Sequence, residues 1–360
     1  MPNELHQNVY RILDANANRA GEGLRTLEEY ARFILDDGWQ SAEIKSLRHE
    51  LTVAMGLLDR ESLLLHRDTS ADVGTEIGLD TEYSRTDLAG VIAAAAARTQ
   101  QSLRVLEEYT KTINGEAAKQ IEQVRYRCYS VAAQLELSAT KNSRQAKLAD
   151  AQLYVLIDAG ESDDAFCETV RILSAGGVDI LQLRDREQSD RLLFDRALVG
   201  SRIAAQNDTL FIVNDRPDLA AAAATDGVHI GQDELPAAAA RSIVGPNRLV
   251  GVSTHNINQV HQAITDGADY IGCGPVFAGT TKTFDEYAGP EFLKQVHDEP
   301  KQRSLPAFAI GGITAGNVQQ VTATGFHRIA VTGAIRDATD KAAAIAVSYT
   351  HLTLPTICSV

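Results

Sequence analysis

The pattern of apolar and polar positions changes once along the chain, near residue 150. From residue 8 to about residue 138, apolar residues recur at three- and four-residue spacing, as at Leu24, Leu27, Tyr30 and Ala31. This spacing is typical of amphipathic helices, and strand-like runs are absent from the region. We therefore expect an all-α domain over residues 1–138 and a polar inter-domain linker over residues 139–150.

The helical half contains an internal repeat. The segment Leu24–Tyr30 returns 79 residues later as Leu103–Tyr109, and Ile44–Arg48 is echoed by Ile121–Arg125. Two duplicated helical hairpins, packed against one another, explain this pattern. Each copy has an arginine four residues before a glutamate, which predicts an ion pair on one helix face. The alternative is an anion pocket, formed with loop residues 72–75 by Arg19, Arg25, Arg98 and Arg104.

From residue 151 onward, short β-branched runs alternate with alanine-rich helical stretches. This alternation predicts βαβ units and a parallel sheet. Eight such runs favour a (β/α)8 TIM barrel over residues 151–346. A doubly wound open sheet is the alternative, but no GxGxxG motif follows the first run to support it. The expected strands are Leu153–Asp158, Asp179–Arg184, Leu210–Asn214, Gly227–Gly231, Leu249–Ser253, Tyr270–Gly274, Ala307–Ile310 and His327–Val331.

The end of the chain departs from this pattern. We expect the closing helix to stop after Ala346, because residues 347–360 contain threonines, β-branched residues and Pro355, which oppose a helix. The segment resembles translated sequencing-adapter sequence more than native protein. We predict that residues 347–360 form a non-native tail that is disordered or loosely docked, and ordered packing of Leu352 and Leu354 in a core groove would contradict this.

Composition narrows the classes of function. A chain of 360 residues with 44% hydrophobic content can bury two domain cores. The formal net charge of −14 argues against a nucleic-acid-binding protein. Membrane-spanning and signal-peptide patterns are absent, so we expect a cytoplasmic protein with small-molecule substrates and no membrane partner. The four cysteines lack metal-binding spacing. Assembly into a homo-oligomer is left open.

Charged side chains follow several of the predicted strands. In a parallel barrel the C-terminal strand ends carry the active site. Asp215 follows the third strand and Glu234 the fourth, so their carboxylates would face one another across a site suited to Mg²⁺. Arg184, Arg186 and Lys282 add positive charge beside them. Together these residues favour a metal-bridged oligophosphate site over helix caps or ordinary surface charge.

A second anion site is expected after the last two strands. Gly311 and Gly312, with Thr314 at a helix start, precede Thr332 and Gly333 after the eighth strand. Barrels of this kind bind phosphate with backbone N–H groups in the same two loops. Two ordinary turns that use glycine for positive φ are the alternative.

Six short motifs follow one another in the barrel half. They are Gln182–Arg184, Phe211–Arg216, Gly227–Gln232, Gly251–His255, Gly274–Phe277 with Thr281 and Lys282, and Gly311–Thr314. Their order and spacing are typical of the thiamine phosphate synthase family. Residues 153–336 resemble that family, and the helical half resembles the domain ahead of this enzyme in some bacterial fusion proteins. The resemblance implies a Mg²⁺-dependent transferase that joins hydroxymethylpyrimidine diphosphate to hydroxyethylthiazole phosphate. In the implied dissociative reaction, pyrophosphate leaves first and the thiazole nitrogen then captures the pyrimidine cation.

The resemblance also implies a role for each site residue. Asp215 and Glu234 would bind Mg²⁺. The diphosphate would contact Arg184, Arg186, Asn214 and Lys282. The pyrimidine would contact Gln182 and Ser253. The thiazole phosphate would contact Thr281, Gly312, Thr332 and Gly333. Within this set, the residues expected to act in catalysis are Arg184, Lys282 and Ser253.

The chain departs from the family pattern at four of these positions. Arg186 stands where lysine is usual, which keeps the charge but alters its geometry. Glu234 stands where aspartate is usual, so neighbouring Asp233 is an alternative metal ligand. Gly279 and Gly333 lack hydroxyl groups common in the family, which weakens the expected hold on the thiazole phosphate.

Two histidines bear on the alternative functions. We interpret His229, inside a strand, as a core residue, whereas His255 at a strand end is better placed for acid–base chemistry. A related barrel that isomerises a thiazole carboxylate phosphate could use such a histidine. It would not need the diphosphate residues, so Arg184, Asp215 and Lys282 favour the synthase. The remaining alternative is a non-catalytic ligand-binding or scaffold protein, with the helical half as its interaction module.

Overall fold

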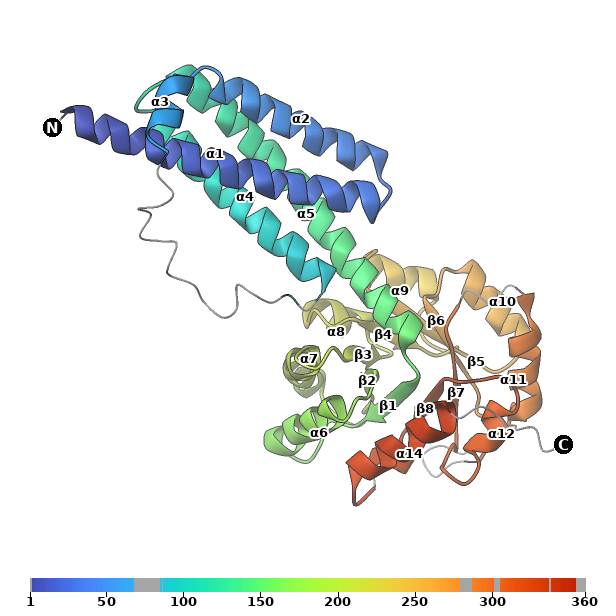
Figure 1. The fold of residues 1–360 in the computed structure, drawn as a ribbon. Helices are drawn as coiled ribbons and strands as arrows, with labels where there is room; N and C mark the ends of the chain where they lie inside the picture. Colours follow the sequence, from blue (N-terminus) through green and yellow to red (C-terminus); the bar gives the residue numbers. More distant parts are fainter. Residues whose placement is uncertain are drawn as a thin grey trace. The chain divides into compact units, whose positions relative to one another are not determined.

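The computed structural model describes residues 2–67, 85, 87–278, 287–300, 305–336 and 338–353. Its contacts divide the chain into two compact units, residues 1–143 and 144–360 (Figure 1). Among the described helices, none is both long enough and apolar enough to cross a membrane. The helices that precede the first strand are α1 (Pro2–Phe33), α2 (Gly38–Met55), α3 (Arg60–Leu65), α4 (Leu88–Thr110) and α5 (Gly115–Asp150).

The first unit is a helical bundle, as the apolar spacing predicts. Helix α1 packs against both α4 and α2. A Cβ atom at Gly23 would collide with the Thr99 side chain and lie 3.2 Å from the carbonyl oxygen of Ala95, so glycine at this position allows α1 to approach α4 closely. The buried leucines of the repeat, among them Leu24 and Leu103, lie in one apolar core.

The internal repeat places an equivalent ion pair in each half of the bundle. Glu28 of α1 is bonded to Arg48 of α2, and Glu107 of α4 accepts a bond of 2.6 Å from Nε of Arg125 on α5. Both glutamate side chains are buried. The predicted four-residue pairs also form, from Arg25 to Glu29 and from Arg104 to Glu108. These arginines therefore bind acidic neighbours on their own helices, and loop residues 72–75 of the alternative anion pocket lie outside the described residues.

Residues 139–150, which we predicted to form the linker, are the last turns of α5, and the boundary between the two units lies among them, after Ser143. Alanine, lysine, arginine and leucine in this stretch are good helix formers, and its polar side chains suit a partly exposed helix. Within the second unit, Arg144 Nε donates to Asp226 Oδ1 at 2.8 Å and Lys147 pairs with Asp208 at 3.0 Å. Leu148 is buried in the barrel interior. The polarity of this stretch reflects ion pairing along a helix.

The second unit is a closed barrel of eight parallel strands, each paired with its neighbours in chain order. This confirms the predicted (β/α)8 architecture and excludes the open sheet. Every expected strand forms, and the ends differ from the prediction by at most two residues. The strands are β1 (Leu153–Ile157), β2 (Ile180–Leu183), β3 (Leu210–Asn214), β4 (Gly227–Ile230), β5 (Leu249–Thr254), β6 (Tyr270–Cys273), β7 (Ala307–Ile310) and β8 (Ile329–Val331).

Two apolar clusters hold the barrel together. The larger one lies between the strands and the helices outside them. The smaller one fills the interior of the barrel and includes the rings of Tyr154, Tyr270 and Phe308. The outer helices are α6 (Asp163–Ala175), α7 (Asp190–Ala205), α8 (Pro217–Ala222), α9 (Ala237–Val244), α10 (Ile257–Thr265), α11 (Gly289–Asp298), α12 (Val318–Thr322), α13 (Gly333–Arg336) and α14 (Lys341–Thr353).

The closing helix extends beyond its predicted end. Helix α14 continues through residues 347–353, and the Leu352 side chain is only 3% exposed in the outer core. Tyr349 donates from its hydroxyl group to Asp179 Oδ2 at 2.6 Å and is close to the carbonyl oxygen of Gly177. These tertiary contacts outweigh the poor helix propensity of the β-branched residues. Loose docking is therefore wrong for residues 347–353. Leu354 lies outside the described residues, and the non-native origin of residues 347–360 stays a prediction.

Candidate active site

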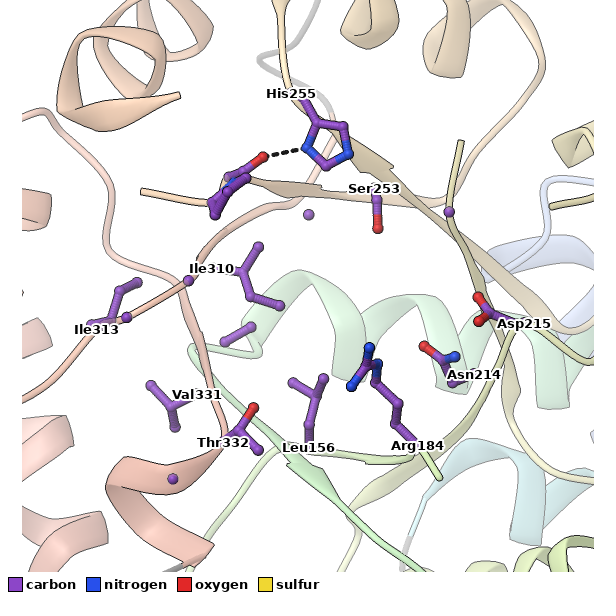
Figure 2. A pocket seen from close by; sticks show the side chains of 18 of the residues that line it. Leu156, Arg184, Asn214, Asp215, Ser253, His255, Ile310, Ile313, Val331 and Thr332 are labelled. Atoms are coloured by element: carbon purple, nitrogen blue, oxygen red, sulfur yellow. Dashed lines mark hydrogen bonds between the residues drawn. The ribbon is translucent and has the colours of Figure 1, made fainter. Parts of the chain in front are cut away.

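A pocket of about 590 Å³ opens where the eight strands end. Its lining residues come from seven strand ends or the loops that follow them, together with Leu156 of β1. Figure 2 shows Arg184, Asn214 and Asp215 on one side, Ile313, Val331 and Thr332 on another, and Leu156 between the two groups. The pocket thus has a charged end and an end built from the loops after β7 and β8, joined by apolar side chains.

At the charged end, two carboxylates converge on one guanidinium group. Nη2 of Arg186 lies 2.8 Å from Asp215 Oδ2 and 3.2 Å from Glu234 Oε1. Asp215 has a left-handed backbone, with φ of 61°, and its N–H donates to the carbonyl oxygen of His229 at 2.7 Å. Strained backbone of this kind is concentrated at functional sites. The predicted facing pair of Asp215 and Glu234 is therefore present.

The carboxylate that faces Asp215 comes from Glu234. A Cβ atom at Gly231 would collide with the Glu234 carboxylate, so glycine at that position leaves room for the side chain to fold back over the strand end. Asp233 also lines the pocket but is exposed. Its side chain has no contact in the described part of the structure that links it to Arg186 or Asp215.

Three further predicted residues lie beside this acidic pair. Arg184 is half-buried, and both this burial and the charge of Arg186 lower the pKa of its guanidinium group, while Asp215 and Glu234 oppose the shift. Asn214 lines the pocket, and its Oδ1 atom accepts a hydrogen bond of 3.4 Å from Nε2 of buried Gln182. Gln182 thus lies behind Asn214 and is not itself part of the pocket lining.

A buried hydrogen-bonded chain runs from the pocket into the barrel. Ser253 Oγ lies 3.0 Å from Nε2 of His229, whose Nδ1 lies 3.3 Å from the hydroxyl oxygen of Tyr270. That hydroxyl group is 3.1 Å from the one of Tyr154. Burial lowers the pKa of His229 to about 4, so the imidazole is neutral at pH 7. His229 is thus a satisfied core histidine, as expected, and it orients a hydroxyl group of the pocket.

The other end of the pocket contains the predicted phosphate-binding loops. Gly312 has φ of 62°, and a side chain there would meet the carbonyl oxygens of Phe277 and Ala278. Gly312, Thr332 and Gly333 all line the pocket. Thr314 was expected at a helix start, which is wrong, because α12 begins at Val318 and a turn intervenes.

Asn317 braces this loop and was not singled out in the sequence. Its Oδ1 accepts from the N–H of Thr314 at 2.8 Å, and its Nδ2 donates to the carbonyl oxygen of Gly312 at 2.8 Å. An asparagine shortly after a Gly-Gly pair is a common turn signal, so the residue could have been found. Tyr154 and Tyr270, whose hydroxyl groups meet inside the barrel, carry no such local signal.

Two predicted residues cannot be placed. Thr281 and Lys282 lie outside the described residues, as does Gly279, so their roles stay predictions. His255, the candidate for acid–base chemistry, lies at the pocket edge with its Nδ1 atom against the carbonyl oxygen of Gly274 (Figure 2). It is exposed, and its described contacts do not link it to another titratable group.

Comparison with known proteins identifies relatives of both units. A family model described as thiamine monophosphate synthase matches residues 153–335, and a ThiD2 family model matches residues 11–134. A thiamine-phosphate synthase from Rhodopirellula baltica is 53% identical over 338 residues, which cover 93% of this chain and 90% of the relative. One from Gloeobacter violaceus is 41% identical, covering 93% of this chain and 94% of the relative.

A solved structure also matches the barrel. Thiamine phosphate pyrophosphorylase from Pyrococcus furiosus aligns with a TM-score of 0.50 and 30% sequence identity. The alignment covers 58% of this chain and 96% of the Pyrococcus chain.

Proposed function

Because the chain belongs to the thiamine monophosphate synthase family, we propose that its barrel joins hydroxymethylpyrimidine diphosphate to hydroxyethylthiazole phosphate, forming thiamine phosphate and releasing pyrophosphate. The observation that carries this proposal is the two-ended pocket. One end brings Asp215 and Glu234 together with Arg184 and Arg186, and the other end consists of the loops at Gly312 and Thr332. A diphosphate and a monophosphate would each find an anion site, with apolar walls between them.

The acidic pair suits a magnesium ion. Oδ2 of Asp215 and Oε1 of Glu234 both lie within hydrogen-bonding distance of one nitrogen atom, so they converge on a point that one cation can occupy. In the described part of the chain, no three His, Cys, Asp or Glu residues form a metal site. Proteins commonly bind Mg²⁺ through one or two carboxylates, with substrate phosphates and water as the other ligands. When bound, the ion would neutralise charge that develops on the departing pyrophosphate.

The protein's own residues would favour departure of pyrophosphate. Arg184 is held half-buried at the charged end, where a fixed positive charge is screened less than in water. As the bond between the pyrimidine methylene carbon and the diphosphate oxygen breaks, its electrons pass to the diphosphate, where such cations stabilise them. Lys282 would contribute in the same way, as its place in the sequence motif implies. No nucleophile–base pair is needed for this step.

The pyrimidine would lie between the two anion sites. The hydroxyl group of Ser253 is oriented by neutral His229 and faces the pocket (Figure 2). Gln182 would act on the ring through Asn214, to which it donates. The loops at Gly312, Thr332 and Gly333, with Thr281, would hold the thiazole phosphate so that the thiazole nitrogen attacks the pyrimidine cation. Holding both partners in one pocket lowers the entropic cost of bond formation.

The direct test is turnover by the purified full chain. With both substrates and Mg²⁺, we expect thiamine phosphate and pyrophosphate in equal amounts, and chelation with EDTA should stop the reaction. Asp215→Asn keeps the side-chain volume but replaces a charged metal ligand with a neutral amide, and we expect it to lower kcat at least about a hundredfold. Asp218→Asn is the matched control, because Asp218 pairs with Arg216 and does not line the pocket.

Two results would contradict the proposal. The first is folded protein that releases no pyrophosphate when both substrates and Mg²⁺ are present. The second is turnover that survives Asp215→Asn unchanged. The tautomerase alternative predicts loss of activity on changing His255 instead, and a scaffold predicts ligand binding that is indifferent to Asp215.

A further inference from the structure

Arg186 occupies an unusual position at the charged end of the pocket. A single nitrogen atom, Nη2, meets both Asp215 Oδ2 at 2.8 Å and Glu234 Oε1 at 3.2 Å. The Arg186 side chain is 55% exposed, whereas the side chains of Asp215 and Glu234 are 19% and 25% exposed. The carboxylates thus belong to the pocket wall, while the arginine reaches them from the solvent side, where water can surround it if it leaves them.

A divalent cation held by these carboxylates would need the oxygen atoms that now accept from Arg186. Two positive charges a few ångströms apart repel one another, so the guanidinium group and the cation compete for one place. A displaced guanidinium group needs a new anionic partner nearby. A diphosphate supplies one, because the planar fork of arginine binds phosphate oxygens in pairs.

We propose that Arg186 couples the binding of a divalent cation to the binding of the diphosphate, by moving from Asp215 and Glu234 to the diphosphate oxygens when the cation takes its place. The cation alone binds weakly because it must displace a guanidinium group that then has no partner. With the diphosphate present, both positive charges are neutralised. This inference rests on the proposed function only in taking a diphosphate as the ligand, and it makes Arg186 a residue that sets the order of binding.

Arg184 does not share this behaviour. It is half-buried and feels the charges of Asp215, Glu234 and Arg186, but no described contact places it across the two carboxylates. It therefore acts as a fixed cation whether or not a divalent ion is bound. Of these two arginines, the exposed one is therefore the one that makes the exchange.

The test measures equilibrium binding to the full chain, without turnover. Titration calorimetry gives the Mg²⁺ affinity of each protein, first with Mg²⁺ alone and then at saturating pyrophosphate. The second titration is corrected for the complex that Mg²⁺ and pyrophosphate form in solution. The ratio of the two affinities is the coupling between the ion and pyrophosphate. We expect Arg186→Gln to bind Mg²⁺ alone about five- to tenfold more tightly than the unchanged protein, since one competing charge at a partly exposed site is removed. We expect the enhancement by pyrophosphate to fall by a similar factor. Arg186→Lys should lie between the two, because an ammonium group lacks the fork.

The controls separate this coupling from other causes. A direct contact between the cation and pyrophosphate raises the Mg²⁺ affinity of every variant. The effect of Arg186 is therefore the difference in this enhancement between the variants and the unchanged protein. Arg191→Gln removes the same charge from an exposed pair with Asp195 and should leave both affinities unchanged. Equal Mg²⁺ affinity in the unchanged protein and in Arg186→Gln, including no binding in either, overturns the inference. Because no product is formed, that outcome is independent of whether the protein makes thiamine phosphate.

Discussion

Replacing Gly312 with alanine should weaken thiazole phosphate binding while leaving the rest of the pocket intact. Gly312 has φ of 62°, a conformation that costs a residue with a Cβ atom about 1–2 kcal/mol. The added methyl group would also lie 2.7 Å from the carbonyl oxygen of Phe277 and collide with that of Ala278. Both carbonyl groups are backbone, so the loop itself must move.

The size of the effect follows from the contacts that such a movement breaks. A hydrogen bond to a charged group contributes about 1.5–3 kcal/mol. Losing one or two backbone N–H contacts to the phosphate, partly replaced by water, should cost about 2–4 kcal/mol of binding free energy. This corresponds to an increase of about 30- to 700-fold in KM for the thiazole phosphate. KM for the pyrimidine diphosphate should stay within about threefold, since its site lies at the other end.

The assay is steady-state kinetics with one substrate varied while the other is saturating. Gly316→Ala is the matched control in the same loop, because a Cβ atom there would meet only Thr314 Oγ1 at 3.8 Å. Unchanged KM in Gly312→Ala would refute the assignment of this loop to phosphate. An equal rise in Gly316→Ala would show that any added methyl group in the loop has the same effect.

Three further predictions concern the supporting structure. Burial lowers the pKa of His229 from 6.5 to about 4, so between these pH values the unfolded chain binds more protons than the folded chain. The barrel should therefore lose about 3 kcal/mol of stability as the pH falls from 6.5 to 4. Thermal unfolding should show a smaller loss over the same pH range for His229→Gln. Arg125→Ala leaves the buried Glu107 carboxylate with only its exposed partners. Denaturant unfolding should show that this variant loses about 3 kcal/mol of unfolding free energy. Arg48→Ala should lose less, because the Arg48 side chain is 34% exposed. Asn317→Ala removes two hydrogen bonds of the phosphate loop and should raise KM for the thiazole phosphate about tenfold with kcat little changed, and an unchanged KM would contradict its bracing role.

The barrel could be predicted because its strand signals are local. Each buried strand is a short, mainly apolar run that stops at polar residues or at glycine, and β3 and β7 match the prediction residue for residue. The same logic placed Asp215 and Glu234 at neighbouring strand ends, where they meet. Alternating strands and helices leave few other architectures, and the short connections make the closed barrel the natural outcome.

What the sequence did not reveal depends on contacts between distant segments. The helix through residues 139–150 is held by pairs such as Arg144 with Asp226, 82 residues away along the chain. Helix α14 persists because Tyr349 reaches Asp179, a contact that spans 170 residues. Propensity describes neighbours along the chain, so it cannot weigh such partners. The position of Arg186 between two carboxylates also depends on distant segments. Its charge can be read from the sequence, but its pairing with Asp215 and Glu234 cannot.

The most direct test of the account is the position of the metal ion. Crystals of the full chain grown with Mn²⁺ and pyrophosphate would show the ion by anomalous scattering, since Mn²⁺ accepts the same oxygen ligands as Mg²⁺. We predict one peak coordinated by Asp215 and Glu234 and by oxygen atoms of the pyrophosphate, with Arg184 beside it. A peak elsewhere in the barrel, or pyrophosphate bound in the Gly312 loop with no ion at the acidic pair, would contradict the account.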